Sequence, residues 1–144
     1  MPFAITHKVR DTCICLHVRR AARAVARRFD EALRPLGLTN GQFSMLTSLN
    51  RPDAARMWEV AEVLAMDRTT LTAALKPLEG RGLVKVLVDR ADKRRRRLAL
   101  TAAGRELLRR ALPVWRREHA ALERLVEKFN SSPDRLRADL RVLS

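Results

Sequence analysis

The sequence predicts a mainly α-helical domain in which one β-hairpin follows several short helices and a long helix lies near each end. Two observations predict this fold. Apolar residues recur at helical spacing toward both ends of the 144-residue chain, and two stretches with strand character flank a charged connection. With 47% hydrophobic residues, a chain of this length can bury one core. We therefore expect a single domain over residues 1–144.

The net charge of +14, from 30 basic and 16 acidic residues, indicates a polyanionic partner. Nucleic acid is the first candidate, and an anionic membrane surface is the second. No apolar stretch reaches the roughly 20 residues that span a bilayer, and the first residues lack the apolar core of an export signal. Cys13 and Cys15 are too few for a disulfide framework. We expect a cytoplasmic protein without a membrane partner.

The first helix is expected from about Lys8 to Leu33, with Pro35 and Gly37 ending it. It carries five arginines, at positions 19, 20, 23, 27 and 28. One apolar stripe runs along it at spacings of four and seven residues. The stripe comprises Ile14, Val18, Val25, Phe29 and Leu33.

A second helix is expected to begin after Thr39, because Thr39 and Gln42 have the spacing of a capping box. Residues 50–56 are predicted to form a loop, and a short third helix follows over residues 57–65. Helical periodicity predicts which side chains of these two helices are buried. They are Phe43, Leu46 and Leu49 in the second helix, and Val60, Val63 and Leu64 in the third.

The fourth helix carries the first candidate binding surface. Asp67 is a good N-cap residue, and the helix is expected to end at Gly80 or Gly82. Leucines at positions 71, 75 and 78 are predicted to pack inward, which leaves hydroxyl and cationic side chains on the opposite face. These are Arg68, Thr69, Thr72 and Lys76. Such a face suits a DNA major groove, where Arg bonds guanine and Thr contacts phosphate or a thymine methyl. An ordinary amphipathic surface helix is the alternative.

Residues 83–88 and 96–101 are predicted to pair as a hairpin with a basic tip. Five consecutive cations occupy it: Lys93, Arg94, Arg95, Arg96 and Arg97. We expect them to contact phosphates or enter a narrow minor groove, and Asp92 to hold the Arg94 guanidinium in a bidentate pair. Two short helices followed by this hairpin predict a winged helix-turn-helix with a two-stranded wing. A solvated basic loop is the alternative.

A long helix is expected after Thr101, and Ser132-Pro133 is expected to start a last short helix that runs to Leu143. The long helix has an apolar seam with coiled-coil spacing, which requires a partner helix. The seam comprises Leu108, Leu112, Trp115, His119, Leu122, Val126 and Phe129. We assign dimerisation to about residues 8–35 and 102–144, and DNA binding to about residues 39–101.

The stretch "DRTTLTAALKPLEGRGLVKVLVDRADKRRRRLALTAAGRELL" resembles the core of the MarR (multiple antibiotic resistance regulator) family. The matching motifs are Asp-Arg-Thr-Thr, "LEGRGLV", Asp92-x-Arg94 and "LTAAG", and "LGLTNGQFSML" matches upstream. The resemblance implies a homodimer that binds double-stranded DNA and represses a near-palindromic operator until a small molecule or an oxidant releases it. The candidate DNA-binding residues are then Arg68, Thr69, Thr70, Thr72, Lys76, Asp92, Lys93, Arg94, Arg95 and Arg96.

Cys15, His17 and Arg20 are the candidate sensing residues. Cys15 falls where the organic-hydroperoxide sensors of this family carry a reactive cysteine, but Phe29 and Asn40 replace their tyrosines. We therefore expect a packed, structural Cys15. A disulfide to the cysteine two positions earlier is not expected, because such positions on a helix point apart. The same divergence argues against a metal site shared by Cys15 and His17.

No catalytic constellation or cofactor motif is present in the sequence, so we do not expect an enzyme. The effector is expected to be a small anionic ligand, for which the arginine-rich first helix offers cations. Three alternatives remain open. The chain could be a redox-sensing repressor acting through Cys15, a basic nucleic-acid-binding protein without an operator, or a protein-interaction module that uses the helical seam.

Overall fold

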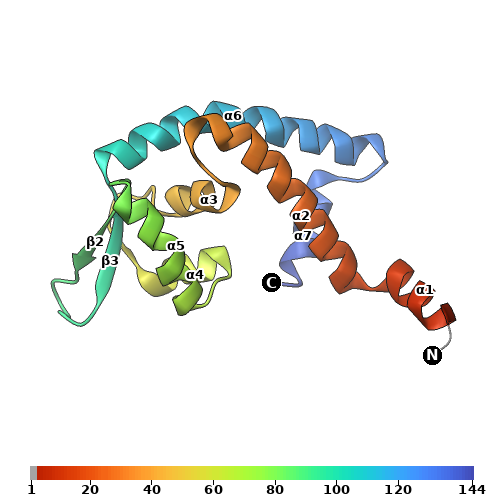
Figure 1. Ribbon diagram of the computed structural model, residues 1–144, viewed down its shortest axis with the longest axis horizontal. Helices are drawn as coiled ribbons and strands as arrows, with labels where there is room; N and C mark the ends of the chain where they lie inside the picture. Colours follow the sequence, from red (N-terminus) through yellow and green to blue (C-terminus); the bar gives the residue numbers. More distant parts are fainter. Residues whose placement is uncertain (1–2) are drawn as a thin grey trace.

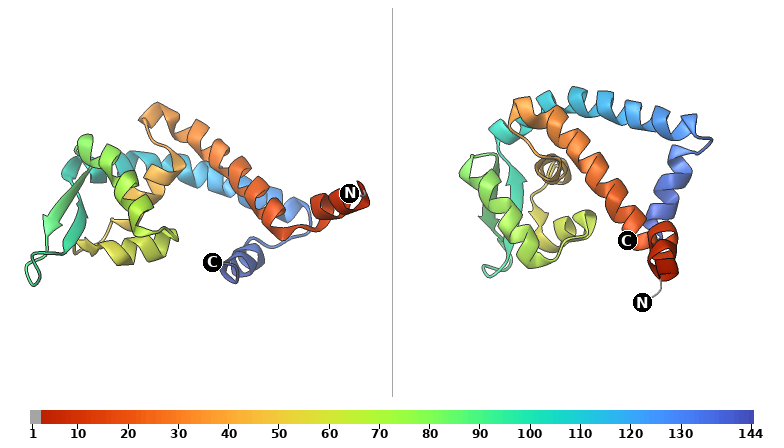
Figure 2. Two further views of the ribbon diagram at one scale, coloured as in Figure 1. Left: turned by 60° about the horizontal axis from the view of Figure 1, so that its bottom comes forward. Right: turned by 45° about the vertical axis from the view of Figure 1, so that its right-hand side comes forward.

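The computed structural model describes residues 3–144, and their fold is mainly helical with one small sheet. A lobe of short helices and strands lies at one end of the longest helix, while the first and last helices lie toward the other end (Figures 1 and 2). In chain order the elements are α1 (Phe3–Thr12), α2 (Ile14–Leu33), the 3-10 turn η1 (Arg34–Leu36), α3 (Asn40–Ser48), β1 (Ala55–Arg56), α4 (Met57–Leu64), α5 (Arg68–Gly80), β2 (Val84–Val88), β3 (Arg96–Leu100), α6 (Ala102–Lys128) and α7 (Pro133–Arg141).

The continuous first helix predicted from the sequence is wrong, because the chain breaks at Cys13. This residue has extended backbone angles, φ −72° and ψ 108°, and separates α1 from α2. Asp11, Thr12 and Cys13 are all weak helix formers, and the Thr12 hydroxyl donates to the Lys8 carbonyl at 2.7 Å. The predicted end is confirmed: α2 stops at Leu33, η1 follows, and the next glycine takes a positive φ.

The two helices after this turn agree with the sequence except at one side chain. The capping box is confirmed, since the Gln42 amide donates to the Thr39 hydroxyl at 3.2 Å and the Thr39 amide donates to Gln42 Oε1 at 3.1 Å. On α4, however, Val63 is 71% exposed. The inward face of α4 is formed by Val60 together with Met57, Ala61 and Leu64, which pack on the core. Val63 lies beyond the edge of this face, on the solvent side.

The sheet has three strands in the order β1–β3–β2, one more than the hairpin predicted from the sequence. The hairpin itself is confirmed, and Val84 pairs with Leu100 at its base. The additional strand comes from the predicted loop over residues 50–56, where Ala55 pairs with Leu98 and Arg56 with Arg97. A two-residue strand is too short to give a period in the sequence. Its pairing satisfies backbone groups on the other edge of β3.

The core of the lobe is built mainly from leucines, together with apolar side chains of other kinds from β1, α4 and β2. All three predicted leucines of α5 are buried, and they pack with Leu33, Leu46 and Leu98. The predicted seam of α6 is buried only near its start: Leu108 is in the core, whereas Phe129 is 74% exposed. Between them, the seam lies half-buried beside α2.

Helix α7 ends at Arg141, two residues before its predicted end. Across residues 3–144, no helix is both long enough and apolar enough to span a membrane.

The first turn of α6 packs directly on the chain that enters β2. The Thr101 amide and hydroxyl both donate to the Leu83 carbonyl, at 3.1 and 3.2 Å. A Cβ at Gly104 would overlap this same carbonyl oxygen. The glycine in the "LTAAG" motif is therefore required by the close approach of helix and strand.

We predict that Gly104→Ala lowers the free energy of unfolding by about 1–3 kcal/mol, because the helix must move away from a backbone atom that cannot yield. Urea denaturation followed by circular dichroism measures the change. Gly80→Ala is the matched control, since a Cβ there meets nothing within 4 Å and alanine favours a helix. Equal stability of the two variants would contradict the close-packing explanation.

Candidate nucleic-acid interface

The start of α5 and the tip of the β2–β3 hairpin both lie on the side of the lobe away from α6 (Figure 1). The predicted outward residues of α5 are exposed on one face and surround a shallow hollow of about 350 Å³. We call them the recognition face: Arg68, Thr69, Thr72 and Lys76. Their direction follows from the burial of the leucines on the opposite side of the helix.

Asp67 begins this helix, as the sequence predicts. Its carboxylate accepts the Thr70 amide at 2.8 Å and the Thr70 hydroxyl at 2.7 Å. These hydrogen bonds, the amide first, hold the pKa of Asp67 below its usual range. The Thr70 hydroxyl is thus engaged at the cap, unlike the hydroxyl of Thr69. Thr72 also turns its hydroxyl back to the helix, donating to the Arg68 carbonyl at 2.8 Å.

The wing consists of β2, β3 and the connection over residues 89–95, and its tip carries exposed cations at positions 93–96. The predicted pairing of Asp92 with the Arg94 guanidinium is wrong. Asp92 Oδ1 accepts the backbone amide of Arg94 at 3.0 Å, and Oδ2 lies 3.3 Å from Arg95 Nε. The Asp92 side chain folds over the turn as aspartates commonly do, so it shapes the backbone and leaves the Arg94 guanidinium without an acidic partner within residues 3–144.

Arg97 is not part of the exposed run, contrary to the sequence prediction. Its Nε donates to Asp89 Oδ2 at 2.7 Å, and its Nη1 donates to the Ala54 carbonyl at 3.1 Å. Asp89 is 5% exposed and also accepts the amides of Ala91 and Asp92, at 2.8 and 3.4 Å. The Arg97 guanidinium is the main reason that the pKa of Asp89 lies below its ordinary value. Arg97 therefore anchors the wing.

A larger hollow of about 510 Å³ lies where α4, α5 and the wing meet. We call it the basic hollow; it is lined by Arg56, Met57, Trp58, Ala61, Arg68, Arg94, Arg95 and Arg96. It brings together residues of α5 and the wing that sequence analysis had assigned separately. Arg56 and Trp58 were missed, because the predicted loop and the short helix after it gave no cationic or aromatic pattern that would set these residues apart from an ordinary surface.

The predicted sensing residues lie on α2 or at its start, apart from this interface. Cys15 is exposed and Cys13 is half-buried, so the packed Cys15 expected from the sequence is not found within the chain. The His17 Nδ1 lies 2.8 Å from the Cys13 carbonyl oxygen. Arg20 borders a surface hollow with two further arginines of α2. Within residues 3–144, no three His, Cys, Asp or Glu side chains are grouped to hold a metal ion.

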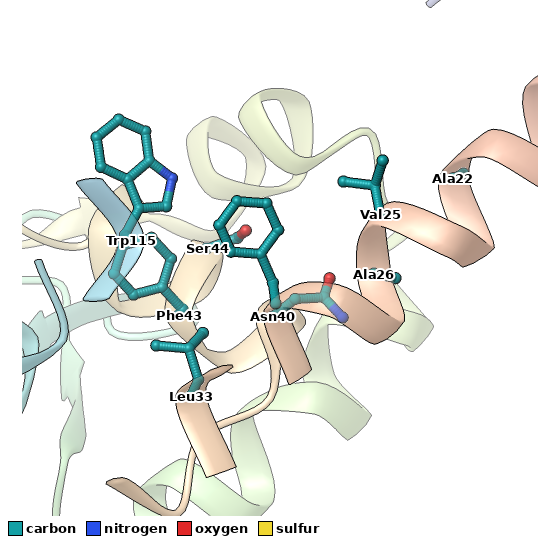
Figure 3. Close-up of a pocket in the computed structure, with 9 residues that line it drawn as sticks. Ala22, Val25, Ala26, Leu33, Asn40, Phe43, Ser44 and Trp115 are labelled. Atoms are coloured by element: carbon teal, nitrogen blue, oxygen red, sulfur yellow. The ribbon is translucent and has the colours of Figure 1, made fainter. Parts of the chain in front are cut away.

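A separate cavity of about 230 Å³ lies between α2, α3 and α6 (Figure 3). We call it the aromatic cavity; it is lined by Ala22, Val25, Ala26, Phe29, Leu33, Asn40, Phe43, Ser44 and Trp115. Trp115 is stacked with Phe43 at a centroid distance of 6.5 Å and with His119 at 4.6 Å. The Asn40 amide groups donate to Asp30 Oδ1, from the backbone at 2.7 Å and from the side chain at 2.8 Å. None of the lining side chains is charged.

Known proteins resemble this chain along most of its length. The model of the MarR family matches residues 38–95. The HTH-type transcriptional regulator TtmR of Methylorubrum extorquens (strain PA1) is 35% identical over 97 residues, which are 67% of this chain and 50% of TtmR. The matched part of the chain thus spans half the length of this curated relative.

Solved structures give a wider match. The transcriptional regulator MosR of M. tuberculosis in complex with DNA is 40% identical, with a TM-score of 0.82, over 92% of this chain and 93% of MosR. The transcriptional repressor CouR bound to p-coumaroyl-CoA is 30% identical, with a TM-score of 0.78, over 94% of each chain.

The buried ion pair of the wing predicts a dependence of stability on pH. The pKa of Asp89 is lower in the folded chain than in the unfolded one, so its contribution is fully present above the ordinary aspartate pKa of about 3.9. It is lost as the pH falls through the lower, folded value. We therefore expect Asp89→Asn to be less stable than wild type at pH 7, and the difference to shrink on acidification below about pH 5.

Thermal unfolding between pH 3 and pH 7, followed by circular dichroism, measures this difference. Asp53→Asn is the control, because Asp53 is exposed and has no ion pair within residues 3–144. A gap between wild type and Asp89→Asn that stayed constant over this range would mean that packing, and not charge, is responsible.

Proposed function

The chain belongs to the MarR family, and from this premise we propose that it is a dimeric transcriptional repressor that binds duplex DNA and is released by a small ligand. The observation that carries the proposal is the basic hollow, where Arg68 of the recognition face and Arg94 of the wing open toward the same space. A helix and a hairpin so arranged can enter a major groove and the neighbouring minor groove of one duplex.

The DNA-contacting residues proposed are those of the recognition face, with Thr70 at its edge, and the wing residues from Asp92 to Arg96. Asp92 acts on the turn, as its hydrogen bond to the Arg94 amide suggests, and the cations act on phosphates or base edges. The DNA complex of the similar regulator MosR supports this assignment. The excess of positive charge over the whole chain supports it as well.

We propose that a second copy of the chain buries apolar side chains that lie far from the sheet. Ile14 at the start of α2, Phe129 after α6 and Val142 after α7 are 66%, 74% and 84% exposed. Large apolar side chains gathered at one end of a chain favour association. A two-fold dimer would set two recognition faces about 34 Å apart, one turn of DNA, which requires a near-palindromic operator.

The aromatic cavity is the proposed effector site, because it lies between α2 and α6 on one side and α3 of the DNA-binding lobe on the other. Its lining has three aromatic rings and the polar groups of Asn40 and Ser44. We propose that an uncharged aromatic part of the ligand enters and that an anionic group stays outside. The arginines near Arg20 do not line the cavity, so they cannot bind the anionic group of a ligand inside it. The p-coumaroyl-CoA complex of CouR supports a ligand of this general kind.

Release by oxidation through Cys15 is the second candidate, favoured by the exposure of Cys15 and the helix break beside it. An organic hydroperoxide would transfer one oxygen to the Cys15 thiolate, giving a sulfenic acid as the O–O bond breaks and an alcohol leaves. The Cys13 thiol could then displace water and close a disulfide. The objection that two such positions on a helix diverge does not apply to an extended Cys13.

We predict that selection from a random duplex pool enriches an inverted repeat, and that Arg68→Ala weakens binding to this operator by about 1–3 kcal/mol but changes binding to random duplex little. Fluorescence anisotropy with labelled duplexes measures both affinities. Arg110→Ala on the exposed surface of α6 is the control. An absence of any consensus would instead support a non-specific basic protein, and equal losses on both duplexes would make Arg68 a phosphate contact.

We further predict that aromatic carboxylates release the operator and that Ala26→Leu, which adds side-chain volume to the aromatic cavity, raises the concentration required while leaving operator affinity unchanged. Cys15→Ser should respond to these ligands as wild type does. Anisotropy titrations with each ligand measure release. If an organic hydroperoxide releases wild type but not Cys15→Ser, and no carboxylate releases either, the redox mechanism replaces the ligand mechanism.

A further inference from the structure

The basic hollow has a composition that neither α5 nor the wing accounts for alone. Five of its eight lining residues are arginines, drawn from β1, α5 and the wing. Like charges brought into one hollow repel one another, and the repulsion is relieved only by an anion or by water and salt. The arrangement therefore calls for an occupant that is itself anionic.

Four of these five guanidinium groups have no acidic partner within residues 3–144. Arg95 is paired with Asp92, and Arg96 donates to the carbonyl oxygens of residues 93 and 95. No ion pair among the residues that the structure describes involves Arg56, Arg68, Arg94 or Arg96. The carboxylate of Glu59, three residues after Arg56, is already engaged by the Arg56 backbone amide at 2.7 Å and by Arg51 at 3.4 Å.

The other residues that line the hollow are apolar. Trp58 is 58% exposed, while Met57 and Ala61 beside it are half-buried and pack on the core. An exposed indole next to cations offers an apolar face and a ring N–H donor together. A sugar-phosphate strand alternates anionic phosphates with less polar sugars, so it matches a hollow that is lined by both arginines and a tryptophan.

Strand β1 fixes the position of Arg56. Its backbone pairs with Arg97 of β3, and the Arg97 guanidinium also holds the Ala54 carbonyl at 3.1 Å. The backbone amide of Arg56 in turn donates to the Glu59 carboxylate in the first turn of α4. The side chain of Arg56 is therefore carried on a fixed backbone between the wing and the helix-turn-helix, which is the position that a strand crossing from one groove to the next would occupy.

We propose that the basic hollow is a seat for the sugar-phosphate backbone of one DNA strand between the major and minor grooves, with Arg56 binding a phosphate and Trp58 packing on a sugar. The proposal rests on the function proposed above and adds two DNA-contacting residues to it. Neither residue reads a base, so both contribute affinity and register without sequence preference.

The test compares wild type, Arg56→Gln and Trp58→Ala on the selected operator over a range of salt concentrations. Arg56→Gln should weaken binding to operator and random duplex alike and reduce the slope of log affinity against log salt by about 0.9. Trp58→Ala should weaken binding about threefold through lost apolar contact and leave the slope unchanged. Arg110→Gln is the matched control and should change neither quantity. Thermal unfolding of each variant checks that the fold is retained.

Trp58 also reports on its own environment. In a Trp115→Phe variant it is the one tryptophan left in the chain, and its fluorescence should change on adding duplex but not on adding inorganic phosphate or AMP at millimolar concentration. A response to phosphate or AMP without one to duplex would overturn the seat in favour of a small-anion site. If wild type binds its operator and Arg56→Gln keeps both affinity and salt slope, the seat alone is wrong. If wild type binds no duplex, both the seat and the proposed function are wrong.

Discussion

The ion pair between Asp89 and Arg97 fixes the geometry on which the candidate DNA surface depends. Asp89 closes the turn of the wing by accepting two backbone amides, and Arg97 reaches across to the Ala54 carbonyl that precedes β1. One buried carboxylate therefore ties the wing, the short strand and the start of α4 into a single unit. A buried charge is tolerated only when it is paired and hydrogen-bonded, which Asp89 achieves with three donors.

The other basic residues divide into those that the chain neutralises and those that it leaves free. Arg28 is paired with Glu118 at 3.0 Å and Arg137 with Glu123 at 2.9 Å, so these cations join elements to one another. On the lobe, the arginines of the basic hollow are mostly unneutralised, and they come from three separate elements. In the proposed complex, a phosphate backbone would supply the missing charge. The repulsion among these arginines in the free protein would then be replaced by attraction to the phosphates.

The aromatic cavity offers a physical route between ligand and DNA under the proposed function. Its walls belong to α2 and α6, which extend toward the exposed apolar end of the chain, and to α3, the first helix of the lobe. Asn40 at the start of α3 is held by Asp30 of α2, whose pKa is lowered chiefly by the Asn40 backbone amide. A ligand between these helices would alter the angle at which the lobe meets α2 and α6, and with it the spacing of two recognition faces in a dimer. The ligand shifts the equilibrium between two such angles of the lobe only if it binds one of the two arrangements more tightly than the other.

The sequence by itself determined the helices with strong periodicity, the caps at Thr39, Asp67 and Thr101, the inward leucines of α5 and the basic tip of the hairpin, because each depends on residues within a few positions of one another. Only the tertiary structure decided the two-residue strand β1, the burial of Arg97 and the basic hollow. These features depend on partners far apart in the chain, such as Arg97 with the Ala54 carbonyl 43 residues earlier. A run of five arginine and lysine residues looks uniform in the sequence. In the fold, the pleat of β3 and the buried carboxylate of Asp89 turn one of the five inward as an anchor, while the turn leaves the rest exposed.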